Sequence, residues 1–269
     1  MIRPKRSLSQ NFLIDKNLRR KIVEQLDALP EDRVLEVGPG NGELSELLVG
    51  RVASLVLIEK DDRLAPVLAR RWDDRREVSV LNADALAVDI SALPEAPFTK
   101  IVSNVPYSIT SPLIFTFLDV EPSPTRIVIL VQEEVAHRLV AKPGGKEYGA
   151  LTIGVQTRAR VRLAFRVGRK AFRPIPGVDS ALVVIEPLPG IGRSEIDAVR
   201  QLSRAAFSRR RKQLGTILRT APEYLMSAPD IEAVTSVLGI DPRTRPEAIP
   251  PDVFASLAIA LQAGRRTGN

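Results

Sequence analysis

The sequence lacks cysteine and has a single histidine, His137, among its 269 residues. Without cysteine the protein has no disulfide bonds, no catalytic thiol and no cysteine-bound zinc. One histidine is also too few for a histidine-based metal site, and it argues against a serine–histidine triad. We therefore predict no metal site. The absence of cysteine fits a reducing compartment, and we expect a cytoplasmic protein.

Long apolar runs are missing as well, since no stretch approaches the ~20 residues that a membrane-spanning helix needs. The hydrophobic share of 44% is nevertheless enough for a sizeable core, which argues against disorder. The net charge is +7, and most of the cations are arginine. A polyanion such as RNA would suit this charge, although an arginine-rich proteome would produce the same composition.

Short apolar runs alternate with helix-like stretches over the first two thirds of the chain. The runs are rich in Val, Ile and Leu and lack polar alternation, as strands buried on both faces do. They cover residues 33–38, 54–60, 78–84, 100–106, 126–132, 161–167 and 181–188. This order predicts an α/β fold with a seven-stranded, mostly parallel sheet.

The character of the sequence changes at the Pro/Gly break of residues 187–192, PLPGIG. The remaining segments have helical periodicity and no strand-like run. We therefore predict two domains: residues 1–190 as a ligand-binding domain and residues 191–269 as a small, all-helical domain.

A glycine-rich loop, VGPGNGE, follows the first strand and opens a helix. Gly38, Gly40 and Gly42 form GxGxG, but Glu43 stands where a dinucleotide-binding loop has its last glycine. Carboxylates at a helix start repel phosphate, and no GK[ST] follows, so a dinucleotide loop and a P-loop are both disfavoured. The loop instead suits close approach of an uncharged or cationic ligand.

Acidic residues at three strand ends, Glu36, Glu59 and Asp84, are expected to surround this ligand. Glu59 is placed to accept hydrogen bonds from ribose hydroxyls, and Asp84 from an adenine amino group. Adenine, ribose and a cation without phosphate describe S-adenosylmethionine, which is the predicted cofactor. The alternative is that Glu59 and Asp84 only cap the helices that follow them.

The segment Asn104-Val105-Pro106-Tyr107 ends the fourth strand-like run. The Asn104 side-chain oxygen and the Val105 carbonyl are two acceptors for the hydrogens of a planar amine. Pro106 restricts Val105 to extended backbone and offers no competing N–H. Tyr107 adds a flat surface on which a base can stack. These four residues are the predicted catalytic set.

With these residues in place, the chain resembles the small-subunit ribosomal RNA adenine N6,N6-dimethyltransferases almost from end to end. Ten blocks match in order: SLSQNFLID, VLEVGPGNGELS, LIEKDDRL, NADAL, SNVPYSITSPL, VQEEVAHRL, YGALTIGVQ, FRPIPGVDSALV, AFSRRRKQLGTIL and DPRTRPEAIPPDVFASLA. The resemblance implies a Rossmann-like class I methyltransferase domain followed by a helical RNA-binding domain.

The resemblance also assigns site residues. It implies a cofactor site formed by Asn11, Leu13, Gly38, Gly40, Glu59, Asp84, Ala85 and Asn104, and it implicates Tyr107 and Phe172 in stacking on the target base. The chain departs from the usual pattern with Ser9, Val105, Ser108 and Glu133, where the family favours glycine, leucine, asparagine and lysine. Val105 acts mainly through its backbone, so little change is expected there.

The expected activity is dimethylation of two adjacent adenosines near the 3′ end of small-subunit rRNA, in a partly assembled 30S-type particle. The basic run Arg209, Arg210, Arg211 and Lys212, on a predicted helix, is expected to contact RNA phosphates. We expect a monomer that does not contact a membrane. Two alternatives stay open: a macrolide-resistance methyltransferase of large-subunit rRNA, and a non-catalytic assembly factor. DNA adenine methyltransferases share the Asn-x-Pro-Tyr motif, but the rest of the chain does not resemble them.

Overall fold

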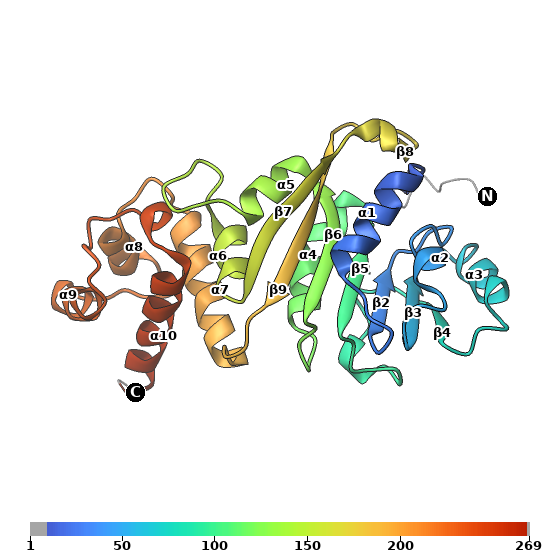
Figure 1. The fold of residues 1–269 in the computed structure, drawn as a ribbon. Helices are drawn as coiled ribbons and strands as arrows, with labels where there is room; N and C mark the ends of the chain where they lie inside the picture. The colour runs from blue at the N-terminus through green and yellow to red at the C-terminus, as the bar shows by residue number, and fades with distance from the viewer. Residues whose placement is uncertain (1–9, 268–269) are drawn as a thin grey trace. The chain divides into compact units, whose positions relative to one another are not determined.

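The computed structural model describes residues 10–267 and divides them into two compact units (Figure 1). The first unit contains residues up to Ala136 together with Arg160–Pro187, and the second contains His137–Ala159 together with the residues from Leu188 onward. The predicted domains, 1–190 and 191–269, begin and end outside the described residues. Within them, the units differ from the prediction in two respects. His137–Ala159 belongs with the C-terminal helices, and the second unit resumes at Leu188 rather than at residue 191.

A seven-stranded sheet forms the centre of the first unit, in the order β4-β3-β2-β5-β6-β9-β7. The five strands from β2 to β6 run parallel, and β9 runs antiparallel to β6. The strands are β2 (Arg33–Val37), β3 (Ser54–Glu59), β4 (Val78–Asn82), β5 (Lys100–Ser103), β6 (Arg126–Gln132), β7 (Ala159–Val167) and β9 (Ser180–Pro187). The predicted fold class, a mostly parallel seven-stranded sheet with a helical C-terminal region, is confirmed.

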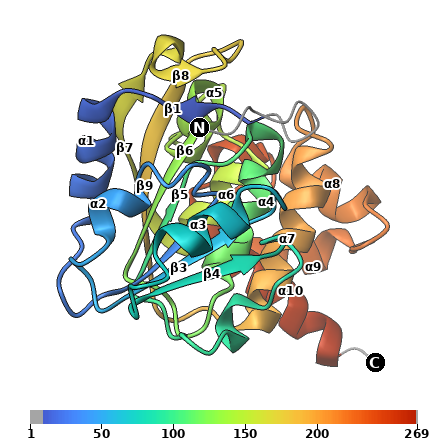
Figure 2. The same cartoon turned by 90° about the vertical axis from the view of Figure 1, so that its right-hand side faces the viewer.

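Helices cover both faces of this sheet, which explains why its strands are apolar on both sides. The helices of the first unit are α1 (Lys16–Leu26), α2 (Ser45–Leu48), α3 (Ala65–Arg71) and α4 (Tyr107–Leu118). One core cluster joins α1, α2 and α3 to alternate strand residues such as Val34, Leu57 and Val102. Figure 2 shows α1 and α4 on opposite faces of the sheet.

A second, two-stranded sheet was not predicted from the sequence. β1 (Phe12–Leu13) pairs antiparallel with β8 (Phe172–Arg173), which places Leu13 opposite Phe172 across 159 positions of the chain. Asp15 then caps α1, because its side chain accepts hydrogen bonds from the backbone N–H groups of Asn17 and Leu18. The N-terminal segment is thereby fixed beside the glycine-rich loop.

The second unit is built from helices around its own apolar core. Its helices are α6 (Ala150–Gln156), α7 (Arg193–Phe207), α8 (Leu214–Thr220), α9 (Ala228–Val237) and α10 (Pro251–Thr267), and α5 (Glu133–Leu139) lies where the chain passes from the first unit into the second. Tyr148, which is fully buried, donates a hydrogen bond to the carbonyl of Ile249 at 2.6 Å. Ile153 of α6 lies in the same core as Leu202 and Phe254. Apolar burial therefore joins His137–Ala159 to helices that follow it by dozens of residues.

Over residues 10–267 no helix is long and apolar enough to cross a membrane. The same residues contain no cluster of three or more histidine, aspartate or glutamate side chains that could hold a metal ion.

Candidate active site

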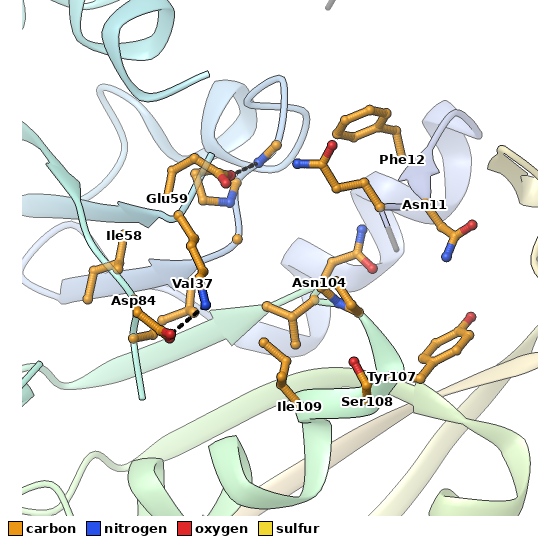
Figure 3. Close-up of a pocket in the computed structure, with 18 of the residues that line it drawn as sticks. Asn11, Phe12, Val37, Ile58, Glu59, Asp84, Asn104, Tyr107, Ser108 and Ile109 are labelled. Atoms are coloured by element: carbon orange, nitrogen blue, oxygen red, sulfur yellow. Dashed lines mark hydrogen bonds and ion pairs between the residues drawn. The ribbon is translucent and has the colours of Figure 1, made fainter. Parts of the chain in front are cut away.

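A pocket lies within the first unit, at the carboxyl edge of the parallel strands (Figure 3). The segments that follow β2, β3, β4 and β5 form most of its wall, and residues 10–12 and Phe172 complete it. β2 and β5 are neighbours in the sheet, although the chain visits β3 and β4 between them. This is the switch point at which open α/β sheets bind their ligands.

The glycine-rich loop forms one side of the pocket and requires glycine for two separate reasons. Gly38 and Gly40 have φ angles of +73° and +61°, which side chains with a Cβ adopt only under strain. A Cβ on Gly38 would lie 2.7 Å from Cγ1 of Val105, and one on Gly40 would lie 2.9 Å from the Phe12 ring. The loop backbone is thus packed directly against the Asn104–Tyr107 segment and against β1.

Glu59, the last residue of β3, is 5% exposed and faces the pocket. One carboxylate oxygen accepts a hydrogen bond from the Gly40 N–H at 3.0 Å (Figure 3), and the other accepts one from the Asp61 N–H at 2.8 Å. Burial raises the pKa of Glu59, and these two N–H donors oppose the rise. Glu59 is therefore fixed in place, with acceptor capacity left for a ligand hydroxyl.

Asp84 lies just after β4 and is paired with Lys60 at 2.6 Å. Its other carboxylate oxygen accepts a hydrogen bond from the Leu86 N–H at 3.1 Å. The Lys60 ammonium lowers the pKa of Asp84, which keeps this carboxylate ionised at neutral pH. Ala85, the next residue, is buried and also lines the pocket.

Asn104 and the three residues after it form the wall between β5 and α4. The Asn104 carboxamide lies at the pocket (Figure 3), and Val105 is also one of the lining residues. The Pro106 carbonyl accepts hydrogen bonds from the Ile109 N–H at 3.1 Å and from the Thr110 hydroxyl at 3.4 Å. The bend is thereby locked into the first turn of α4.

Tyr107 is the first residue of α4 and is half-buried. Its hydroxyl lies 2.5 Å from the hydroxyl of Ser180, the first residue of β9. Burial raises the pKa of Tyr107, so the phenol stays neutral near pH 7. The hydrogen bond to Ser180 ties the ring to a strand that is not adjacent to β5 in the sheet.

The structure brings together the predicted residues Asn11, Gly38, Gly40, Glu59, Asp84, Ala85, Asn104, Val105, Pro106, Tyr107 and Phe172. Leu13 is the exception: its side chain is 1% exposed and belongs to the core, and its carbonyl accepts hydrogen bonds from the Arg19 guanidinium. Phe172 lines the pocket but is only 2% exposed, and it also belongs to the core cluster.

The expectation that Glu36 borders the ligand is wrong. Glu36 is 1% exposed, does not line the pocket, and accepts a hydrogen bond from the Ser45 hydroxyl at 2.6 Å. Burial raises its pKa to about 8. Glu36 lies one residue before the end of β2, so the alternation of the strand turns its side chain toward the core formed with α2.

Several lining residues were missed by the sequence reasoning. Phe12 lies between the two predicted residues Asn11 and Leu13, and its ring packs on Gly40. Gln10 also lines the pocket, and its side-chain amide donates to Asp61 at 3.1 Å. The order Gln-Asn-Phe-Leu inside the matched block was the available signal. The remaining missed residues are Val37, Pro39, Glu43, Ile58, Lys60, Ala83, Ser108 and Ile109.

The basic run 209–212 does not lie on a helix, contrary to the prediction. α7 ends at Phe207 and α8 begins at Leu214, so the run forms the turn between them. Arg210 is engaged within the second unit, where its guanidinium pairs with Glu247 at 2.8 Å and donates to the Lys146 carbonyl at 2.7 Å. Arg211 and Lys212 are exposed.

The charges of the pocket restrict the ligand that it can hold. Its lining includes three carboxylates, on Glu43, Glu59 and Asp84, and its only cationic side chain is Lys60 among the described residues that line it. Lys60 is already paired with Asp84. A phosphate would be repelled here, whereas a ribose, an adenine amino group and a cationic sulfur suit the acceptors. The lining therefore fits S-adenosylmethionine better than a dinucleotide.

Comparisons with known proteins agree with this geometry. The family model "Ribosomal RNA adenine dimethylase" matches residues 1–262. A curated relative from Geobacter metallireducens, "Ribosomal RNA small subunit methyltransferase A", is 38% identical and is matched over 97% of both chains. Two solved structures are also similar. A dimethyladenosine transferase from Plasmodium falciparum has a TM-score of 0.79 at 26% identity, covering 96% of this chain and 98% of its own. The 23S rRNA methyltransferase ErmE has a TM-score of 0.71 at 25% identity, covering 94% and 100%.

Proposed function

The chain belongs to the ribosomal RNA adenine dimethylase family, and on that premise we propose that it dimethylates the N6 amines of two adjacent adenosines near the 3′ end of small-subunit rRNA, with S-adenosylmethionine as the methyl donor. One observation carries the proposal. Asn104 and the Val105–Tyr107 bend line the same pocket as Glu59 and Asp84, so acceptors for an amine lie beside acceptors for an adenosine-like cofactor.

We propose that Glu59 accepts hydrogen bonds from the ribose hydroxyls. Asp84 accepts one from the adenine amino group once its ion pair with Lys60 opens. Gly38 and Gly40 allow close approach of the loop backbone, while Asn11 and Ala85 complete the wall. Leu13 supports this site indirectly, because its burial and its β1 pairing hold Asn11 and Phe12 at the pocket. When bound, S-adenosylmethionine supplies a methyl group on a positively charged sulfur, which keeps the bonding electron pair after transfer.

The residues at the end of β5 are proposed to activate the target amine. The lone pair of adenine N6 is delocalised into the ring, which makes it a poor nucleophile. The Asn104 side-chain oxygen and the Val105 carbonyl each accept one N6 hydrogen, and this holds the nitrogen in a more tetrahedral geometry with its lone pair toward the methyl donor. The methylated amine is acidic and loses its proton to water, so no general base is required.

The target base must leave its stack to reach the pocket. We propose that Tyr107 stacks on one face of the extruded adenine, which recovers ~1–3 kcal/mol per base. Phe172 is proposed to close the other face. Because Phe172 is 2% exposed, this role requires its ring to shift out of the core when the base enters.

The substrate proposed is a partly assembled 30S-type particle, on which the protein acts as a monomer in the cytoplasm. The names of the related proteins, small-subunit methyltransferases, favour the small subunit over the large subunit, although the fold is also that of ErmE. Catalysis is favoured over a purely structural assembly role because the full set of Asn104, Glu59 and Asp84 is present in one pocket.

The test is methyl transfer to purified small and large ribosomal subunits that lack these methyl groups, followed by mass spectrometry of rRNA digests. We expect dimethyladenosine only in the small-subunit RNA. Asn104→Ala should abolish transfer while changing cofactor affinity much less. Ser236→Ala, which removes an exposed hydroxyl from α9 outside the pocket, serves as the control. Label on large subunits alone, or wild-type turnover by Asn104→Ala, would refute the proposal.

A further inference from the structure

Two branched aliphatic side chains are exposed to solvent on the segment between β8 and β9, which begins at the pocket residue Phe172. Ile175 is 61% exposed and Val178 is 46% exposed, and both lie between β8 and β9. Phe172, at the start of this segment, lines the pocket, and Ser180, at its end, contacts the Tyr107 hydroxyl. The exposed pair therefore belongs to a short loop that begins and ends at the proposed target-base site.

The loop is held in place at several points, so its exposed tips are presented by a fixed backbone. The Asp179 carboxylate accepts a hydrogen bond from the Arg169 N–H at 2.9 Å, and the Asp179 carbonyl accepts one from the Glu133 N–H at 3.1 Å. Pro176, between the two exposed aliphatic residues, is buried. A contact made by such a loop loses little conformational entropy on binding.

Three exposed cations precede the two aliphatic side chains in the chain. They are Arg169, Lys170 and Arg173. Arg173 lies on the loop itself, and the Arg169–Asp179 hydrogen bond joins the stretch just before the loop to its end. Cations suit the phosphates of a nucleic acid, and nearby apolar side chains suit the exposed face of a base. A protein partner would be less well matched, because residues 169–178 carry three exposed cations beside only two exposed aliphatic side chains.

We propose that Ile175 and Val178 form a wedge that fills the gap left in the RNA stack when the target adenine is extruded. This inference rests on the proposed function and deepens it. Extrusion costs a few kcal/mol of stacking, and apolar side chains inserted between base steps replace part of that contact. The wedge acts on bases beside the target, whereas Tyr107 acts on the target itself.

The test compares the double variant Ile175→Ser/Val178→Ser with the wild type on small subunits that lack the methyl groups. We expect kcat/KM to fall about tenfold, the change that corresponds to one lost base contact, with the cofactor Kd and the unfolding midpoint unchanged. The double variant Ile175→Leu/Val178→Ile should restore the rate, since it retains apolar bulk. Val237→Ser, which removes an 85% exposed aliphatic side chain from α9, should have no effect.

Each outcome decides a separate question. Wild-type kcat/KM in the serine pair would overturn the wedge, and so would a leucine/isoleucine pair as slow as the serine pair. A wild-type protein that transfers no methyl group to the small subunit would instead refute the proposed function.

Discussion

Substituting Gly38 by alanine should disturb the catalytic segment as well as the loop that carries the glycine. The φ angle of +73° costs a side chain roughly 1–2 kcal/mol. The new Cβ would also lie 2.7 Å from Cγ1 of Val105, which is 0.7 Å closer than the 3.4 Å at which ordinary contacts begin. Val105 is buried and β-branched, so it has little rotamer freedom and its backbone must move. This overpacking adds about 1–3 kcal/mol.

Gly50 provides a matched control, because it has the same backbone strain without the clash. Its φ is +71°, and the nearest atom to an added Cβ is the end of the Arg75 side chain at 4.0 Å. We expect Gly50→Ala to lower the unfolding free energy by roughly 1–2 kcal/mol and Gly38→Ala by ~2–5 kcal/mol, both measured by urea denaturation.

The methyl-transfer rate separates the two variants more sharply. A shift of several tenths of an ångström in Val105 misplaces one amine acceptor, so Gly38→Ala should slow transfer by ~10–100-fold, while Gly50→Ala keeps the wild-type rate. Single-turnover assays with radiolabelled methyl donor, at a temperature where both variants are folded, measure this. If the two variants matched in rate and stability, the inferred coupling between loop and catalytic segment would be refuted.

Three further predictions concern charged residues. Burial raises the pKa of Glu36 from 4.5 to about 8, so between these pH values the folded state holds a proton that the unfolded state releases. The unfolding free energy should therefore fall as the pH rises from about 4.5 to about 8, by up to ~1.4 kcal/mol per pH unit. Glu36→Gln should flatten this slope in urea titrations, and an unchanged slope would contradict the assignment. Asp84→Asn should weaken cofactor binding at least tenfold by calorimetry. Lys60→Met removes the ion-pair partner of Asp84 from the pocket wall, and because that side chain is 57% exposed, it should change the Kd less than fivefold. Equal effects would argue against Asp84 as a ligand acceptor. Arg210→Ala should lower the melting temperature, because it breaks the contacts with Glu247 and the Lys146 carbonyl. Arg211→Ala should leave the melting temperature unchanged and weaken RNA binding in a salt-dependent way. The reverse pattern would refute the assignment of Arg210 to structure and Arg211 to RNA binding.

The sheet was predictable from the sequence because burial on both faces leaves a direct trace in composition. Each predicted run begins and ends within three residues of an observed strand, and the run 126–132 coincides with β6. The pocket followed from the same logic, since the carboxyl ends of parallel strands must meet at one edge, and this brought Glu59, Asp84 and Asn104 together.

Contacts between distant, short segments could not be predicted in this way. β1 and β8 have two residues each, which is too short for any periodicity, and their pairing depends on the tertiary fold. The side-chain direction of Glu36 depended on strand alternation, which an apolar run on both faces conceals. The basic run 209–212 looked helical because arginine and lysine favour helices, but the contacts of Arg210 with Glu247 and the Lys146 carbonyl stabilise a turn instead.

The helical unit also determines when each core can close while the chain is being synthesised. α6 leaves the ribosome before β9 and α7, yet Tyr148 and Ile153 find their neighbours only when Leu202, Ile249 and Phe254 have followed. A nascent chain that stops near residue 190 would expose this apolar surface and would be a target for chaperones. Emergence of α10, rather than emergence of the sheet, is therefore the step after which the second core can close.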